Sequence, residues 1–410
     1  MTKYLIIGGG TTTARAVEGV REVDAGGSIA VVAAEPHLPY DRPPLSKGIL
    51  LGSDEPTAAL PHDEAWYREQ QVDLRLGDPV ASIDSDAHTV TLVSGEQLEW
   101  ERLLLATGSS VRCLDVPGAE LPGVFSLRTL EDSLALLERF KEGGRVAIVG
   151  AGWIGLEVAA AARSHGCSVV VIEPQQAPLL AVMGERIGTW FADLHRAHGV
   201  DFRFGAGVAA IDGASAATGL TLADGSHVRA STVVVGVGIR PNTMLAEAAG
   251  LEVDNGIITD EALRTSRTDI WAAGDVANWQ IQALGRSIRV EHWANAHDGG
   301  LAAGRSMAGA DVVYDPLPFF YSDQYDAGLE YTGYVPRGTD TEVILRGDPE
   351  SGAFMAFWTV PEGDGVRVLA GMHVNVWDTI DAIIALIRAD HPIDPARLAD
   401  SEAPLAELAA

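Results

Sequence analysis

The chain has 410 residues, with 57 Asp or Glu against 29 Lys or Arg and a formal net charge of −28. Nucleic acids and anionic membrane surfaces are themselves negative, so this charge disfavours both as partners. The length predicts two or three domains, and no apolar run reaches the roughly 18 residues of a membrane span. Because the only cysteines, Cys113 and Cys167, stand far apart, we expect no disulfide framework, zinc site or dithiol centre, and a cytoplasmic protein.

The N-terminus opens with the pattern of a βαβ unit. An apolar run predicts a buried strand, the glycines at 8–10 a tight turn, and residues 11–23 a helix whose first amides can hold a pyrophosphate. A second strand ends at Glu35, from which a carboxylate can accept hydrogen bonds from an adenosine ribose. Thr13 stands where the motif has its third small residue, so a glycine-rich turn without a ligand remains the alternative.

A second copy of this pattern is complete. A strand over 145–149 leads into Gly150, Gly152 and Gly155, which allow the turn, the approach of a pyrophosphate and the close packing of helix on strand. The next strand ends at Glu173, where an adenosine ribose would lie. A strand-end charge that points to solvent is the alternative for this carboxylate.

Two dinucleotide folds in one chain predict two dinucleotides, and the chemistry that uses both is hydride exchange between a nicotinamide and a flavin. Two further apolar strands, over 103–108 and 231–238, end in small-residue turns of the same form. The segment 265–277 contains a short strand ending in Gly-Asp275, which can direct a carboxylate at a polyol.

The pattern changes from about residue 316. Four short alternating strands separated by glycine-rich and acidic turns predict an antiparallel sheet. A segment with apolar residues at helical spacing, 377–389, predicts a helix, and we expect the domain formed by these elements to pack onto the other two. The expected strands lie at 328–335, 341–347, 353–360 and 366–374.

Seven segments of the chain resemble the two-dinucleotide flavoprotein reductases, and within them the ferredoxin-reductase branch. They lie at 39–47, 105–108, 127–132, 150–157, 273–275, 291–296 and 321–324. The resemblance implies an α/β fold with two Rossmann-like dinucleotide-binding domains of the glutathione-reductase type and a C-terminal α+β domain. It implies a discontinuous FAD-binding domain at 1–112 and 242–315, an NAD-binding domain at 113–241 and the C-terminal domain at 316–410.

The resemblance also implies which residues bind the cofactors. Glu35 would contact the adenosine ribose of FAD, the backbone of Val80 the adenine, and Asp275 the ribityl chain. The FAD set is Gly8, Gly10, Thr12, Thr13, Glu35, Arg42, Lys47, Val80, Ala106, Thr107, Gly108, Arg128, Asp275, Trp293 and Tyr321. The NAD set is Gly150, Gly152, Trp153, Ile154, Gly155, Glu157, Glu173 and Gly238.

Lys47 and Glu157 are the residues that the resemblance makes catalytic. Lys47 should lie near flavin N5 and pair with Glu157, where nicotinamide and flavin stack. Without the resemblance, Lys47 is a surface lysine after a proline turn and Glu157 a first-turn acid stabilised by the helix dipole. The chain departs from the family pattern at 11–13, at Trp153, and at Tyr321, where the family often has tryptophan.

The implied function is an NADH-dependent ferredoxin or rubredoxin reductase. NADH would give a hydride to FAD, and single electrons would pass to an iron–sulfur carrier that serves an oxygenase such as a P450 or a ring-hydroxylating dioxygenase. The alternatives are an apoptosis-inducing-factor-like NADH/FAD-binding protein and a small-molecule reductase of the monodehydroascorbate type. An acidic reductase that meets a usually acidic ferredoxin predicts a local basic patch at the flavin edge.

Two further expectations concern metals and assembly. His195, His198 and His292 show no metal-ligand spacing on one helical face, so we assign no metal. No cysteine precedes Cys113, so the dithiol chemistry of other branches lacks support. We expect a monomer or a homodimer.

Overall fold

The two glycine-containing βαβ patterns lie in two separate compact units. The computed structural model describes residues 1–409. Unit 1 comprises Met1–Pro44, Asp54–Ser110 and Ile239–Pro316, and unit 2 comprises Leu45–Ser53, Val111–Gly238 and the described part of the chain from Leu317 onward. Residues 45–53, which the expected boundaries place in the first domain, thus cluster with unit 2, and the nicotinamide and C-terminal segments cluster together.

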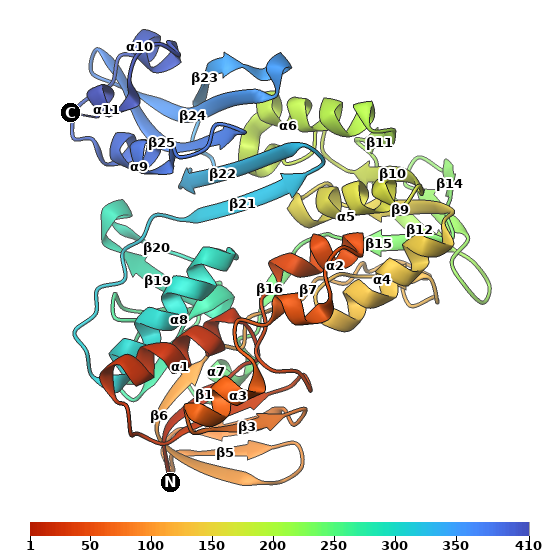
Figure 1. Ribbon diagram of the computed structural model, residues 1–410. Helices are drawn as coiled ribbons and strands as arrows, with labels where there is room; N and C mark the ends of the chain where they lie inside the picture. The colour runs from red at the N-terminus through yellow and green to blue at the C-terminus, as the bar shows by residue number, and fades with distance from the viewer. Residues whose placement is uncertain (410) are drawn as a thin grey trace. The chain divides into compact units, whose positions relative to one another are not determined.

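Unit 1 is built on a seven-stranded sheet with the order β3-β2-β1-β6-β5-β4 and with β18 also paired to β6 (Figure 1). The strands β3, β2, β1, β6 and β18 run parallel, whereas β4, β5 and the start of β6 are antiparallel. Their apolar side chains form a core that includes Leu5, Trp100 and Ile270. The bounds are β1 Thr2–Ile7, β2 Ile29–Ala33, β3 Val72–Leu76, β4 Val80–Asp84, β5 Thr89–Leu92, β6 Gln97–Leu105 and β18 Ile270–Ala272.

Helix α1 (Thr11–Val23) packs along α8 (Trp293–Ala308) (Figure 1). Glycines make the approach possible: a Cβ at Gly19 would lie 2.2 Å from the carbonyl oxygen of Leu301, and one at Gly304 would lie 2.2 Å from that of Ala16. The other elements of unit 1 are short. They are η2 Pro56–Ala59, α3 Glu64–Glu69, α7 Met244–Ala248, η3 Gly274–Val276, η4 Gln282–Leu284, and the sheet of β17 Ile257–Thr259, β19 Ala277–Ile281 and β20 Arg286–Ile288.

Three short elements lie where the chain passes between the units. They are η1 Pro43–Ser46 and the paired strands β7 Ser109–Val111 and β16 Ile239–Pro241.

The nucleotide-fold part of unit 2 contains a parallel sheet with the order β11-β10-β9-β15-β8 (Figure 1). An antiparallel sheet of β12, β13 and β14 packs its apolar residues with those of β9, β10 and β15. The strands are β8 Val124–Phe125, β9 Arg145–Val149, β10 Ser168–Glu173, β11 Val200–Phe204, β12 Val208–Asp212, β13 Gly219–Leu222, β14 His227–Arg229 and β15 Thr232–Val235. The helices are α2 Gly48–Leu51, α4 Leu130–Glu142, α5 Trp153–Ser164 and α6 Leu180–Ala197.

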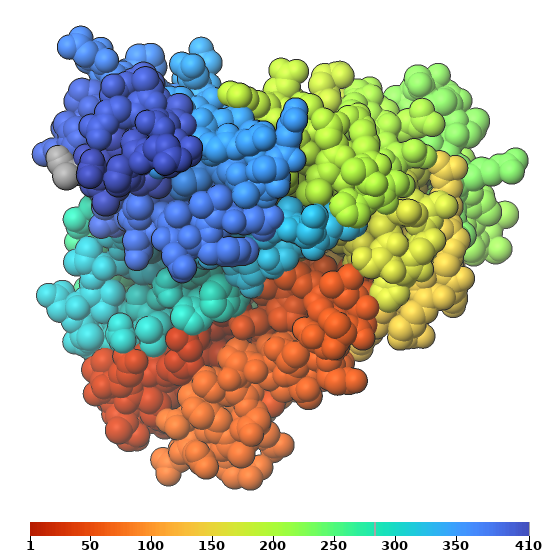
Figure 2. Space-filling model, turned by 45° about the horizontal axis from the view of Figure 1, so that its top comes forward, coloured from red at the N-terminus to blue at the C-terminus, as the bar shows by residue number. Residues whose placement is uncertain are grey.

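The C-terminal part of unit 2 is an antiparallel sheet, β21-β22-β25-β24-β23, with helices packed on it. Figure 2 shows the atoms of the last segment, in dark blue, beside those of the paler blue part of the chain. The strands are β21 Phe319–Gln324, β22 Ala327–Gly333, β23 Glu342–Asp348, β24 Ala353–Glu362 and β25 Gly365–Val374. The helical segments are η5 Pro349–Ser351, α9 Ile380–Arg388, α10 Pro395–Ala399 and α11 Leu405–Leu408.

The α/β class and the C-terminal α+β arrangement are therefore confirmed, and four of the five strands of the last sheet were expected. Strand β21 was not. Among the described residues no helix combines the length and the apolar character needed to cross a bilayer.

Candidate cofactor-binding sites and active site

The first glycine turn brings three segments of unit 1 together at the start of α1. A Cβ at Gly8, where φ is +149°, would lie 2.1 Å from the carbonyl oxygen of Ala106. A Cβ at Gly274, where φ is +76°, would lie 2.3 Å from the Oγ1 of Thr12. The 106–108 turn and the loop that carries Asp275 thus meet the N-terminus of α1, although they are far apart in the sequence.

Gly10, by contrast, is not required by packing. Its φ is −113°, which any residue adopts, and the nearest described atom to an added Cβ is the Tyr40 carbonyl oxygen at 3.9 Å. Among the described residues no side chain caps the N-terminus of α1. A bare turn in front of uncapped helix amides has the form of a pyrophosphate site, since both the amides and the helix dipole attract anions.

Glu35 lies two residues after the end of β2, in a small polar group. Its carboxylate accepts a hydrogen bond from the Tyr40 hydroxyl at 2.5 Å and pairs with the Arg42 guanidinium at 2.9 Å. The resemblance assigns Glu35 to the ribose and Arg42 to the flavin, and the structure joins the two side chains directly. The backbone N–H of Gly77 donates to the Glu35 carbonyl at 3.0 Å, so the turn that leads to Val80 also lies at this strand end.

His292 lies at the start of α8, directly before Trp293. Burial lowers the pKa of His292 to about 4, and the nearby Asp275 carboxylate opposes this shift only in part. The imidazole is therefore neutral at neutral pH. The sequence pattern does not reveal that His292 lies near the Asp275 loop, although both lie within segments that resemble the family.

In the second glycine turn, which lies in unit 2, packing again requires some of the glycines and not the middle one. A Cβ at Gly150, where φ is +102°, would lie 2.4 Å from the Gly236 carbonyl oxygen, and one at Gly155 would lie 2.2 Å from the Gly150 carbonyl oxygen. At Gly152 φ is −79°, and no described atom lies within 4 Å of an added Cβ. The protein itself requires glycine at the first and third positions only, so the open second position fits a ligand that approaches the helix amides.

Glu173 holds this turn to the end of β10. Glu173 is 8% exposed, and its carboxylate accepts hydrogen bonds from the backbone N–H of Ala151 at 2.8 Å and of Gln175 at 3.0 Å. The alternative that it points to solvent is wrong. Gly238 accepts from the backbone of Arg112 at 2.9 Å.

Lys47 and Glu157 form a buried ion pair, with Nζ to Oε1 at 3.0 Å and with 17% and 6% of their side chains exposed. The Ser46 hydroxyl donates to Glu157 Oε2 at 2.5 Å, and the Ser322 hydroxyl donates to Oε1 at 2.6 Å. Asp323 lies 3.4 Å from the Lys47 ammonium. Burying an ion pair is tolerable only when hydrogen bonds satisfy it, and these contacts do so. Lys47 is thus not a surface lysine after a proline turn, which was the alternative interpretation of the sequence.

Aromatic side chains lie beside this ion pair and at the start of α5. The Lys47 ammonium lies 5.3 Å from the centre of the Tyr321 ring, a cation–π contact. Trp153 packs against Phe191 and Phe320, with ring centres 5.4 and 4.9 Å apart. The neighbouring Ile154 is 44% exposed, and Arg128 precedes the capping box that starts α4.

The predicted site residues thus fall into two groups, one in each unit. Those of unit 1 are Gly8, Gly10, Thr12, Thr13, Glu35, Arg42, Val80, Ala106, Thr107, Gly108, Asp275 and Trp293. The NAD set and Lys47, Arg128 and Tyr321 lie in unit 2. Within the described range, no cluster of three or more His, Cys, Asp or Glu could hold a metal ion.

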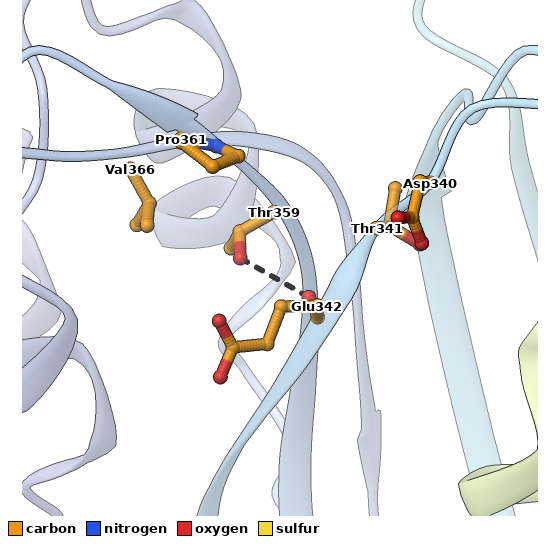
Figure 3. A pocket seen from close by; sticks show the side chains of 6 residues that line it. All are labelled: Asp340, Thr341, Glu342, Thr359, Pro361 and Val366. Carbon is orange, nitrogen blue, oxygen red and sulfur yellow. Dashed lines mark hydrogen bonds between the residues drawn. The ribbon is translucent and has the colours of Figure 1, made fainter.

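One hollow lies apart from these residues, beside the start of β23 (Figure 3). Its walls include the carboxylates of Asp340 and Glu342, and the Thr359 hydroxyl donates to the Glu342 carbonyl at 3.1 Å. None of its lining residues belongs to the predicted sets.

Comparison with known proteins gives the family. Residues 2–300 match the pyridine nucleotide-disulphide oxidoreductase family, and residues 319–409 match the reductase C-terminal family. The chain belongs to the pyridine nucleotide-disulphide oxidoreductases. It is 41% identical to the ferredoxin–NAD(+) reductase component of the anthranilate 1,2-dioxygenase system of Burkholderia cepacia, covering 97% of each chain. It is 36% identical to rhodocoxin reductase of Rhodococcus erythropolis, covering 97% of this chain and 92% of that one.

Solved structures of this oxidoreductase family agree with the fold. A ferredoxin reductase from Rhodopseudomonas palustris superposes with a TM-score of 0.93 at 35% identity and covers 100% of both chains. The putidaredoxin reductase of a covalent complex with putidaredoxin superposes with a TM-score of 0.93 at 32% identity, covering 99% of this chain and 98% of that chain. As a pyridine nucleotide-disulphide oxidoreductase, the chain is a flavoprotein that uses FAD and NAD(H). The two open glycine positions, Gly10 and Gly152, fit two dinucleotides.

Proposed function

We propose that this chain is an NADH-dependent reductase of an iron–sulfur ferredoxin or a rubredoxin, serving an oxygenase such as a P450 or a ring-hydroxylating dioxygenase. The observation that carries the proposal is the presence in one chain of two glycine turns whose middle glycines, Gly10 and Gly152, leave room for a ligand: no described atom lies closer than 3.9 Å to an added Cβ at either position. Two dinucleotides suit hydride transfer from a nicotinamide to a flavin. The relative with 41% identity is the reductase component of a dioxygenase system, which supports a protein carrier as the acceptor.

The predicted domains carry these roles. In the proposal, the domain formed by residues 1–112 and 242–315 binds FAD and the domain at 113–241 binds NAD. Residues 316–410 form the C-terminal domain. The residue sets predicted for FAD and NAD are those that contact the cofactors. The protein acts in the cytoplasm, which agrees with two unpaired cysteines, Cys113 and Cys167. Its proposed state is a monomer or a homodimer.

Lys47 and Glu157 are the proposed catalytic pair. When bound, FAD would supply the redox chemistry, the uptake of a hydride from NADH and the release of two electrons one at a time. The pair orients the nicotinamide, because its ammonium and carboxylate are held by Ser46, Ser322 and Asp323 and lose little freedom when substrate binds.

Steady-state turnover tests the function. NADH oxidation by the purified holoenzyme is followed through cytochrome c, with and without an added [2Fe–2S] ferredoxin. We expect a cytochrome signal that requires the ferredoxin. A long-lived complex of reduced flavin with NAD and no turnover would instead indicate a binding protein, and direct turnover with a small-molecule acceptor would indicate a small-molecule reductase.

Removing either member of the pair tests its role. Lys47→Met and Glu157→Gln should each slow flavin reduction by NADH in stopped-flow experiments, on the order of tenfold to a hundredfold, and leave FAD content near wild type. The double variant should lose little more, because contacting residues share one interaction. Losses that simply multiply would contradict the pairing. The exposed pair of Lys141 and Glu138, 2.8 Å apart on α4, is the matched control.

A further inference from the structure

A line of buried hydrogen bonds leads away from the Glu157 carboxylate. Ser322, which donates to Glu157 at 2.6 Å, receives a hydrogen bond from the Gln324 side-chain amide at 3.1 Å. The Gln324 side-chain oxygen lies 2.8 Å from Nε2 of His195 on α6. The Tyr325 hydroxyl lies 3.4 Å from Nδ1 of the same ring. Glu157, Ser322, Gln324 and His195 are all buried, and all five residues belong to unit 2.

The donors along this line all point toward the carboxylate. Gln324 donates through its nitrogen to Ser322, so its oxygen must accept, and His195 Nε2 must carry the proton. Because burial lowers the pKa of His195 to about 4, the ring is neutral and its Nδ1 accepts from the Tyr325 hydroxyl. Ser322 already accepts from Gln324, so its own hydrogen goes to Glu157. Bonds in one direction polarise one another and strengthen the last bond.

Two features of the backbone, in β21 and in the turn after it, place the side chains of this line of hydrogen bonds. Residues 320, 322 and 324 of β21 are buried and alternate with more exposed neighbours, so Ser322 and Gln324 lie on one face of the strand. Tyr325, in the turn that follows, has a φ of +58°, which is unusual for a bulky residue. Its ring stacks on that of His198, with centres 3.7 Å apart and planes 8° from parallel. A strained residue held by packing is typical of a constrained site.

We propose that Ser322, Gln324 and His195 are positioning residues that fix the Glu157 carboxylate in its productive orientation for the nicotinamide. This inference rests on the proposed function, in which Glu157 contacts the nicotinamide. Glu157 extends from α5 on a flexible side chain. The Ser46 hydroxyl holds its Oε2, whereas at Oε1 the flexible Lys47 side chain cannot fix the carboxylate alone. The Ser322 hydroxyl and the rigid amide behind it supply the second fixed direction.

The test removes the line at two places. In Gln324→Leu and Ser322→Ala, the limiting rate of flavin reduction by NADH should fall about tenfold, whereas the Kd for NADH should change less than about twofold. Ser322→Thr keeps the hydroxyl on a β-branched side chain that suits a strand and should restore the rate to within about twofold of wild type. In a Glu157→Gln background, Gln324→Leu should cause no further loss.

A second measurement does not depend on turnover. Urea unfolding of the Ser322→Ala and Glu157→Gln variants and of their double variant should give non-additive midpoints, since the two side chains contact each other. His373→Leu removes a buried histidine of the same sheet that lies 2.8 Å from Glu330. It is the matched control and should lower stability without slowing flavin reduction.

Two results would overturn the positioning role alone: a wild-type reduction rate in both Gln324→Leu and Ser322→Ala, or a loss that persists undiminished in the Glu157→Gln background. Additive unfolding midpoints would contradict the hydrogen bond itself. If NADH does not reduce the wild-type flavin, or if Glu157→Gln is reduced at the wild-type rate, the proposed function of Glu157 fails, and the positioning role fails with it.

Discussion

At the scale of single residues, one carboxylate, that of Glu173, holds the backbone of the glycine turn and can still accept a hydrogen bond from a ribose. Glu173 was predicted from the spacing of the second motif, and the structure adds that its oxygens accept hydrogen bonds from the Ala151 and Gln175 backbones. A carboxylate oxygen has more than one lone-pair direction, so these bonds leave capacity for a ribose hydroxyl. The charge is held in a buried place beside the Gly150–Gly155 turn.

This charge predicts a preference for NADH over NADPH. A 2′-phosphate about 4 Å from Glu173 would cost between roughly 1 kcal/mol in water and roughly 4 kcal/mol at an effective dielectric near 20, so kcat/KM should favour NADH by about tenfold to several hundredfold. Glu173→Gln removes the charge but keeps an acceptor, and the preference should shrink by about tenfold or more. The measurement is kcat/KM for both nucleotides in each protein, with Glu138→Gln on α4 as control. Equal use of both nucleotides by wild type would refute the assignment.

The residues that sequence reasoning missed share one property. Ser322 contacts Glu157 across 165 residues of the chain, and Gln324 contacts His195 across 129 residues. No local pattern relates such positions. Lys47 and Glu157 were found only because a family resemblance links them. The Thr11 hydroxyl likewise donates to the Asp41 carboxylate at 2.7 Å. The sequence shows that Thr11 departs from the family pattern, but it does not show this contact.

At the scale of elements, the sequence pattern succeeded where most buried positions of an element are apolar or small. The helix expected over 11–23 is α1, and the strand expected over 145–149 is β9. Strand β21 was missed because its buried face carries Ser322 and Gln324 beside Phe320, so the apolar alternation is broken. A local rule that fails at a functional cluster is expected, since function and folding make different demands on the same positions.

The start of α5 offers a prediction that separates folding from binding. Gly152→Ala places a Cβ where no described atom lies within 4 Å, at a φ that alanine adopts, so the unfolding midpoint and FAD content should stay near wild type. The added methyl group should obstruct the approach of a pyrophosphate to the helix amides and raise KM for NADH by about tenfold or more.

Two comparisons make this result interpretable. Gly26→Ala also meets no described atom within 4 Å and should change nothing. Gly155→Ala should destabilise the fold, because its Cβ would lie 2.2 Å from the Gly150 carbonyl oxygen. An unchanged KM for NADH in a folded Gly152→Ala protein would exclude this turn as the nicotinamide dinucleotide site.

At the scale of the whole molecule, the net charge of −28 must influence how acceptors reach the flavin. A potential of one sign over much of a surface repels ions of the same sign over about a Debye length, which is roughly 30 Å at 0.01 M salt and 10 Å at 0.1 M. An acidic carrier therefore meets long-range repulsion at low salt. A local basic patch at the flavin edge, as expected from the sequence, would act only at shorter range.

Acceptors of different charge distinguish these two influences. Ferricyanide is a small trivalent anion, and its rate of reduction by the NADH-reduced enzyme should rise several-fold between about 0.01 and 0.1 M salt as the repulsion is screened. A neutral quinone, the control, should show no such rise. With an acidic ferredoxin, screening weakens the long-range repulsion and the short-range attraction together, so its rate should depend on salt less than that of ferricyanide. A ferricyanide rate that falls with salt would show that positive potential dominates at the flavin edge despite the net charge, and would contradict the prediction.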